Sequence, residues 1–184
     1  MNRRRCLIEI ARGVGLSVSL TMAPRPTGAE QTVDRDADAA LAKLYGTEPA
    51  AKRLGAEAKG ILVFPRIVKA GFLVGAQYGE GVLLKGGRPV GHYNIAAGSY
   101  GFQAGAQRFA YAMFFMKDTA LTYLENSAGF EVGAGPSVVV LDSGKAKTLT
   151  TTTSRDDVYA FIFGQKGLMA GMGLQGSKIT KVSP

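Results

Sequence analysis

Side chains able to carry out acid–base or nucleophilic chemistry are few and scattered along the chain. His92 is the only histidine, and Ser99 is the next serine after it. A hydrolase would have to combine these two residues with a distant acid, yet the sequence around Ser99 lacks the register of a nucleophile elbow. His92 also has no second histidine and no nearby cysteine with which to hold a metal. The residues therefore favour a non-enzymatic protein with no metal and no cofactor.

Two further stretches have the residue types of a ligand site without its full requirements. Residues 171–176 have the Gly-x-Gly-x-x-Gly spacing of a dinucleotide-binding loop. Only eight residues follow them, so the helix and the acidic residue that this loop needs are missing. Asp156 and Asp157 are interpreted as a solvated turn, because a calcium site would need further oxygen ligands.

Four copies of a glycine pattern organise the elements that must position any site. They share Gly-(Phe/Leu)-x-(Val/Ala)-Gly-(Ala/Met) and begin at Lys69, Ser99, Ser127 and Gln165. On an extended strand the two glycines lie on one face and the apolar positions on the other. A nearly bare face allows another element or a ligand to approach closely. The variable x position is too diverse for a catalytic role, since its occupants are Leu73, Gln103, Glu131 and Met169.

Periodicity and punctuation predict an α+β domain. Helices are expected over 33–46, 48–59 and 118–126, the first with Asp34 as its N-cap and Gly46 as its left-handed end. In the second, Thr47 or Glu48 is the expected cap and Pro49 takes the first turn. Strands are expected over 61–64, 70–78, 81–85, 90–96, 100–107, 109–116, 130–134, 138–141 and 148–153, with 167–182 closing the sheet.

Two details of this prediction depend on local residue types. Residues 85–89 have the glycines of a hairpin turn. Pro65 is expected to end the strand over 61–64. Residues 158–163 could open as a helix behind a capping box, but their aromatic and β-branched composition favours a strand. The sum is a strongly curved, glycine-rich, barrel-like antiparallel sheet of about eight to ten strands.

The first 29 residues are predicted to be an export signal peptide. They have a basic start, an apolar stretch over 13–23 and small residues before Glu30. Arg4 and Arg5 also resemble a twin-arginine signal, so the general secretory and twin-arginine routes both stay open. Loss of this segment would remove five arginines, one glutamate and Cys6, lowering the net charge from +8 to +4. A charge of +4 does not favour nucleic-acid binding. The expected location is the periplasm or the cell envelope.

Several separate motifs resemble the SYLF domain family. They are residues 58–64, 68–72, 100–106 and 164–177, and the likeness runs from about Ala39 to Val182. The resemblance implies a single domain over residues 30–184 that binds lipids or an anionic membrane surface. Some eukaryotic members bind actin, but actin is not an expected partner of an exported bacterial protein.

Three basic residues are the predicted head-group contacts. Lys69 and Lys166 match basic family positions beside the first and last glycine motifs, whereas Arg66 stands where the family usually has a small or polar residue. Three such cations contribute about 3 kcal/mol near an anionic surface, which gives only about millimolar binding. An apolar contribution is therefore needed, and a groove along the curved sheet is favoured over the acid-rich helix near 34–45.

Two alternatives stay open. The three basic residues could simply be solvated. The domain could also be a structural or protein-interaction module of the envelope that holds a partner along an open sheet edge or the glycine face.

Overall fold

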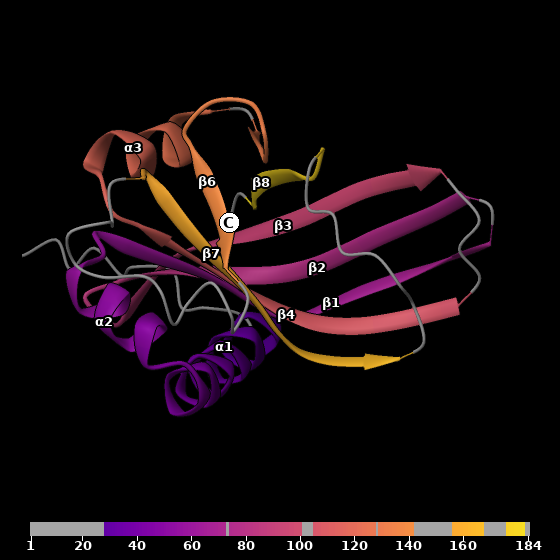
Figure 1. Cartoon of the computed structure of the whole chain (residues 1–184), viewed down its shortest axis with the longest axis horizontal. Helices are drawn as coiled ribbons and strands as arrows, with labels where there is room; N and C mark the ends of the chain where they lie inside the picture. The colour runs from indigo at the N-terminus through magenta and orange to yellow at the C-terminus, as the bar shows by residue number, and fades with distance from the viewer. Residues whose placement is uncertain are drawn as a thin grey trace, which may run out of the picture.

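The central strands alternate buried and exposed residues, and they pair into one curved sheet (Figure 1). The computed structural model describes residues 28–72, 74–100, 105–127, 129–141, 156–167 and 176–182. These residues form α1 (Gly28–Thr47), α2 (Pro49–Glu57), β1 (Gly60–Phe72), β2 (Val74–Lys85), β3 (Arg88–Tyr100), β4 (Gly105–Phe115), α3 (Asp118–Asn126), β5 (Phe130–Glu131), β6 (Val138–Leu141), β7 (Val158–Gly167) and β8 (Lys178–Val182). The predicted α+β class with a strongly curved sheet is confirmed.

The strand order in the sheet is β5-β8-β3-β2-β1-β4-β7-β6. Neighbouring strands run antiparallel, except that β6 pairs with β7 in parallel. The prediction of a wholly antiparallel sheet is therefore wrong for this pair. A parallel pair needs a connection of a dozen or more residues, and the long segment between β6 and β7 provides it.

Strand β1 passes through Pro65, where the sequence predicts a stop. The pairing of β1 with β2 shifts between Val63 and Arg66, and its pairing with β4 shifts between Phe64 and Ile67. A bulge of this kind accommodates a proline, because the missing N–H need not join the ladder. The strand then continues to Phe72, so Arg66 and Lys69 both belong to β1.

The first glycine motif lies at the tip of a hairpin and not along one strand. Gly71 on β1 lies opposite Gly75 on β2, so the predicted strand over 70–78 is wrong. A Cβ at Gly71 would collide with the backbone of Gly75, which explains why position 71 has no side chain. The predicted turn over 85–89 is confirmed, since Gly86 and Gly87 have φ of 57° and 75° and connect β2 to β3.

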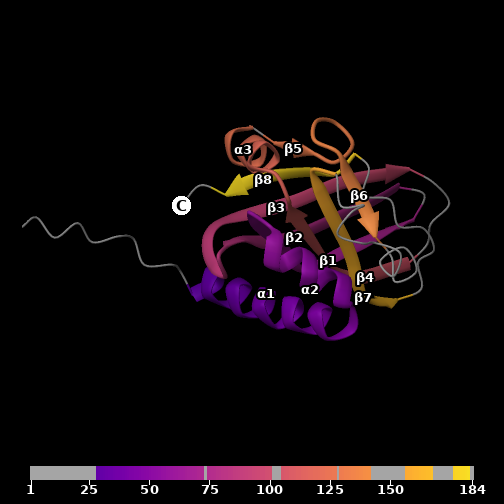
Figure 2. The same ribbon diagram turned by 60° about the vertical axis from the view of Figure 1, so that its left-hand side comes forward.

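Helices α1 and α2 cover one face of the sheet, here called the outer face (Figure 2). Their buried residues pack with outward side chains of the central strands, including Val63, Val82, Phe114 and Phe161, to form the outer core. The inner core lies on the opposite, inner face, where α3 packs against residues such as Leu62, Phe64, Tyr111 and Phe115. Strand β2 is buried continuously over 81–84, where both faces are covered, and alternates over 74–80.

The predicted helix boundaries hold to different degrees. Helix α3 matches the prediction, and Pro49 opens α2 behind Glu48. Helix α1 begins six residues before the predicted Asp34 cap, at Gly28, and runs one residue past Gly46. Asp34 and Gly46 therefore lie inside α1, so neither caps it.

The remaining strands match the prediction in part. Residues 158–163 belong to β7, which confirms a strand, and 138–141 form β6. Of 130–134, only Phe130 and Glu131 form a strand. The predicted strand over 148–153 lies outside the described residues, as do residues 1–27, residues 101–104 of the second glycine motif and residues 168–172 of the fourth.

Asp157 links three elements. Its carboxylate accepts hydrogen bonds from the Ser137 backbone N–H (3.0 Å) and hydroxyl (3.2 Å), and Lys117 Nζ lies 2.7 Å from Oδ1. The hydrogen bond from Lys117 and those from Ser137 hold the pKa of Asp157 below its usual value. The predicted solvated turn thus has a structural role that ties β6, β7 and the start of α3 together.

Candidate functional site: a basic groove on the outer face

A groove of about 370 Å³ lies on the outer face between α1 and strands β1, β4 and β7. Four basic residues from these four elements line it: Lys43, Arg66, Arg108 and Lys166. The rest of its wall is small or apolar, with Ala40, Pro65, Phe109, Ala110, Phe163 and Gly164. This basic groove has the composition of a site for an anionic group beside an apolar one.

Strand register explains why three of the four cations meet. Arg108 on β4 lies directly opposite Lys166 on β7, and Val68 on β1 lies opposite Arg108 on its other side. Directly paired residues point to the same face of a sheet, so these side chains share the outer face. Arg66 precedes Val68 by two residues and therefore lies on that face as well.

The ion pairs leave most of this positive charge uncompensated. The Arg66 Nη2 atom lies 3.6 Å from Oδ2 of Asp36 on α1, and both side chains are largely exposed. In the part of the chain that the structure describes, Lys43, Arg108 and Lys166 form no ion pair. Three cations around one groove are consequently available to an external anion.

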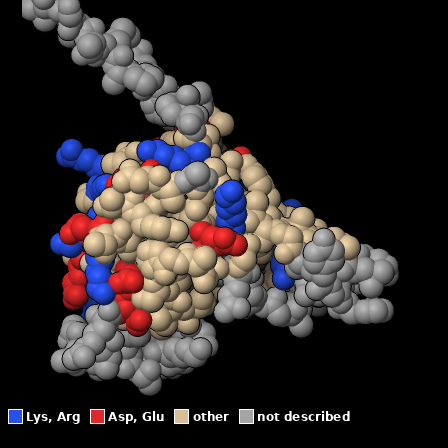
Figure 3. All heavy atoms as spheres, turned by 90° about the horizontal axis from the view of Figure 1, so that it is seen from above, with Lys and Arg blue, Asp and Glu red and all other residues tan. Residues whose placement is uncertain are grey.

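Other charged regions have mixed sign. Viewed from above, Lys and Arg side chains lie among Asp and Glu side chains toward the end of the molecule that carries α3 (Figure 3). One such pair is Lys85 and Glu125, whose Nζ and Oε1 atoms lie 2.7 Å apart. The fields of interspersed opposite charges largely cancel at a distance, so the α3 end of the molecule favours neither an anionic nor a cationic ligand.

The structure brings Arg66 and Lys166 together and sets Lys69 apart. Lys69 is only 6% exposed and lies on the inner face, with Gln77 of β2 opposite it on one side and Gln107 of β4 on the other. The Gln77 amide donates to the Ser177 hydroxyl at 2.8 Å. Lys69 thus belongs to a buried polar row and cannot contact the basic groove.

Lys43 and Arg108 are functional candidates that the sequence prediction missed. Arg108 lies two residues after the second glycine motif. Only its pairing with Lys166 across β4 and β7 identifies it as a groove residue. Lys43 lies on the predicted helix, but no sequence pattern places a helix residue beside a strand 65 positions later.

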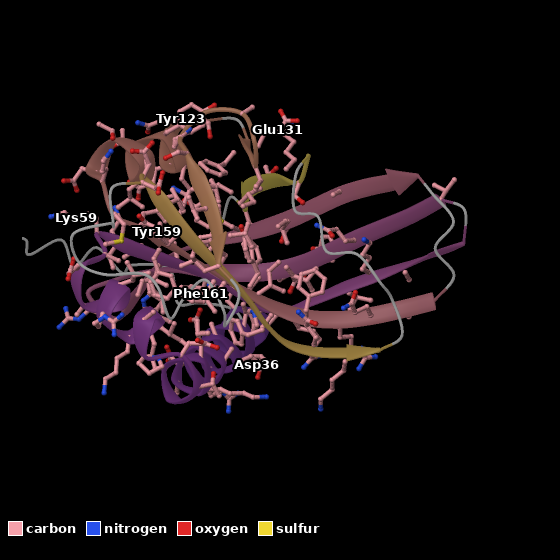
Figure 4. The ribbon with its side chains drawn as sticks, in the orientation of Figure 1. Asp36, Lys59, Tyr123, Glu131, Tyr159 and Phe161 are labelled. Carbon is pink, nitrogen blue, oxygen red and sulfur yellow. The ribbon has the colours of Figure 1, made fainter. Side chains whose placement is uncertain are left out.

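A second groove, of about 450 Å³, adjoins the basic groove across Arg66. It runs between the N-terminal half of α1 and strands β1 and β2, and its apolar residues include Val33, Pro65, Val68 and Tyr78. Figure 4 shows Asp36 on α1, at the boundary where this groove meets Arg66. An apolar groove thus adjoins the cationic one on the outer face.

His92 supports α1. Its Nε2 lies 2.9 Å from Asp34 Oδ1, and its Nδ1 lies 3.8 Å from Glu30 Oε1. Ser99 is seven residues further along the same strand, roughly 20 Å away at the usual rise per residue. The two residues therefore cannot form a catalytic pair. Among the described residues, no three His, Cys, Asp or Glu side chains are grouped as metal ligands.

None of the three described helices is both long enough and apolar enough to cross a bilayer.

Comparison with protein families matches the second half of the chain. The model of the Ysc84 family, described as a Las17-binding protein actin regulator, matches residues 96–183. No curated protein matches the chain. The family match spans β4, α3 and β5 to β8 and includes Arg108 and Lys166. The match over residues 96–183 therefore supports the predicted SYLF domain family, a family of binding-type domains.

Proposed function

We propose that this protein is a non-enzymatic module that binds anionic lipids at a membrane surface through the basic groove. The observation that carries the proposal is the convergence of Lys43, Arg66, Arg108 and Lys166 around one groove. Lipid phosphates and carboxylates are the anions that such a cluster complements. The SYLF resemblance and the family match support a binding role over a catalytic one.

The strength of the electrostatic contribution is modest. Each cation near an anionic membrane surface contributes about 1 kcal/mol, so the three cations that form no ion pair contribute about 3 kcal/mol, equivalent to a Kd of about 6 mM. Salt screens this attraction further. Physiological binding therefore also needs apolar contacts next to the groove.

We also propose that the protein acts outside the cytoplasm, in the periplasm or attached to the envelope. The basic start, the apolar stretch over 13–23 and the small residues before Glu30 support an export signal over residues 1–29. An intact-mass measurement on protein recovered from the periplasm should give a chain that starts at Glu30. A chain that retains Met1 in the cytoplasm would contradict export.

Vesicle sedimentation tests the lipid proposal. The protein should sediment with vesicles of phosphatidylcholine and phosphatidylglycerol but not with phosphatidylcholine alone. Arg108→Glu combined with Lys166→Glu should lower the bound fraction at least about tenfold, because attraction becomes repulsion at the groove.

The matched control is Lys52→Glu combined with Lys59→Glu, two exposed lysines in and after α2. It makes the same change in net charge away from the groove and should bind nearly as the unmodified protein does. Equal losses in both double variants would mean that total charge and not the groove drives binding.

A protein-interaction module of the envelope is the second candidate. The family description, which names a Las17-binding actin regulator, supports it, because an acidic protein segment would complement the same groove. This reading predicts no sedimentation with vesicles and the co-purification of an envelope protein that Arg108→Glu with Lys166→Glu releases.

A further inference from the structure

The outer face of the sheet continues beyond α1 (Figure 1). The exposed residues on β1, β2 and β3 in that part of the face are small or apolar. The exposed residues of this distal face are Val68 and Ala70 on β1, Val74, Ala76 and Tyr78 on β2, Ala96 and Gly98 on β3, and Ala106 on β4. Val68, Val74 and Tyr78 are 40%, 59% and 50% exposed. Exposed apolar patches of this kind mark contact surfaces more often than chance.

The distal face and the basic groove are one continuous surface. A single row of paired residues crosses five strands in the order Ala96, Tyr78, Val68, Arg108 and Lys166. Adjacent strands are about 4.8 Å apart, so the change from apolar to cationic side chains occurs within one strand spacing. The next row, Gly98, Ala76, Ala70 and Ala106, is made of small residues and is therefore nearly flat.

Two of the acidic residues near this surface, Asp36 and Glu80, lie at its α1 end, and Glu131 lies beside Lys178 at the β5–β8 edge of the sheet. Asp36 pairs with Arg66, and the Tyr78 hydroxyl donates to Glu80 Oε1 at 3.2 Å. The half of the distal face beyond Tyr78 has apolar side chains on β2 and β1, next to Arg108 and Lys166 on β4 and β7. A flat apolar surface with a cationic rim matches the interface of an anionic bilayer, where phosphates lie just above the hydrocarbon.

We propose that the distal face is the surface that lies against the bilayer, with Val68, Val74 and Tyr78 in the interfacial layer and Arg108 and Lys166 on lipid phosphates. Tyrosine suits that layer because its ring is apolar and its hydroxyl polar. A second copy of the chain would place its own Arg108 and Lys166 near those of the first copy, and these like charges would repel. An anionic membrane has the opposite charge and therefore complements the cationic rim. This inference rests on the proposed lipid binding and adds which side chains enter the membrane.

The absence of tryptophan from the sequence allows a sharp test. Val74→Trp places a single tryptophan on the distal face, which can be excited apart from the tyrosines. Val90→Trp is the matched control, since Val90 is also an exposed valine (49%) but lies near the opposite end of the sheet. With phosphatidylcholine–phosphatidylglycerol vesicles, the emission of the Val74→Trp protein should shift to shorter wavelength and be quenched by brominated acyl chains. The Val90→Trp protein should show neither change.

A charge-neutral variant gives a second readout. Val74→Ser combined with Tyr78→Ser should lower the partition coefficient of the protein between water and vesicles about tenfold. The reason is that the two serines bury less apolar area on binding than valine and tyrosine do. Both side chains are exposed, so the far-ultraviolet circular dichroism should stay unchanged.

The outcomes separate this inference from the proposed function. Sedimentation with anionic vesicles without quenching of the Val74→Trp protein would overturn the distal face and leave the groove proposal standing. A lack of sedimentation would overturn both. A dimer that dissociates on Val74→Ser with Tyr78→Ser, with vesicle binding unchanged, would assign the face to a second copy of the chain.

Discussion

Tyr111 shows how a single atom limits the stability of the inner core. Its side chain is fully buried and stacks on Phe64 at a ring distance of 6.4 Å, yet its hydroxyl has no hydrogen-bond partner among the residues that the structure describes. Burial alone raises the pKa of Tyr111 far above the usual tyrosine value, so the group stays neutral. A buried donor without a partner costs about 1–3 kcal/mol.

Tyr111→Phe is therefore expected to raise the free energy of unfolding by about 1 kcal/mol, measured by urea denaturation. Tyr159→Phe is the control, because the Tyr159 hydroxyl donates to Asp156 Oδ2 at 3.2 Å and accepts from the Asp156 N–H at 3.1 Å. That substitution should lower stability by a similar amount. Equal destabilisation in both variants would show that the Tyr111 hydroxyl has a partner in solution.

At the residue scale, the sequence predicted two of the four groove cations. Arg66 and Lys166 both line the basic groove, while Lys69 is on the other face. Residues three apart on one strand point to opposite faces, so Arg66 and Lys69 could not both contact one ligand from β1. The sequence did not place Arg66 and Lys69 on one strand, because Pro65 was expected to end the strand before them. Arg108 and Lys43 depend on pairing between distant segments, which no local pattern contains.

At the element scale, α1 is held differently along its length. From its middle to its C-terminal end it buries Ala37, Leu41 and Leu44 in the outer core. Its N-terminal half, which lines the apolar groove, is held by the contact of His92 with Asp34. The sequence assigned Asp34 to a helix cap, because Asp is common at that position. Only the approach of β3 to α1 shows its actual role.

His92→Ala should loosen the N-terminal half of α1 selectively. Loss of a hydrogen bond of about 1 kcal/mol corresponds to about fivefold faster amide exchange over residues 30–36, with little change over 41–47. Lys85→Ala is the matched control, because it breaks the Lys85–Glu125 pair and should affect α3 instead. Uniform acceleration along all of α1 would show that the helix opens as one unit.

Bulges and long-range contacts also limited the prediction of other elements. The glycine motif was interpreted as a strand, but in its first copy it closes the β1–β2 hairpin. Asp157 was interpreted as solvated, although Ser137 and Lys117 bind it from two other elements. In contrast, α3 and the 85–89 turn depend on nearby residues alone, and both were predicted correctly.

At the scale of the whole molecule, two apolar cores share one sheet. Outward residues of β1, β2 and β4 form the outer core with α1 and α2, and inward residues of the same strands form the inner core with α3 and β5. Composition and periodicity predicted the curved α+β class. The strand order was not predictable, because β7 pairs with β4 and β8 pairs with β3 across long stretches of sequence.

This shared sheet predicts that the two cores unfold together. Leu44→Ala opens a cavity in the outer core and Leu124→Ala opens one in the inner core, and each should cost about 2–5 kcal/mol. Because neither core can lose its strands without exposing the other, both variants should show one transition by calorimetry. Circular dichroism in the far and near ultraviolet should give the same midpoint.

The double variant makes the test stricter. The two leucines lie on opposite faces and in different clusters, so their costs should add within about 0.5 kcal/mol while the single transition persists. An early transition in Leu44→Ala alone, with the inner core intact, would instead mean that α1 and α2 detach from the sheet. In that case the basic groove, which needs Lys43 of α1 beside Arg66, would be lost before the sheet unfolds, and vesicle binding would decline at a lower temperature than the far-ultraviolet signal of the strands.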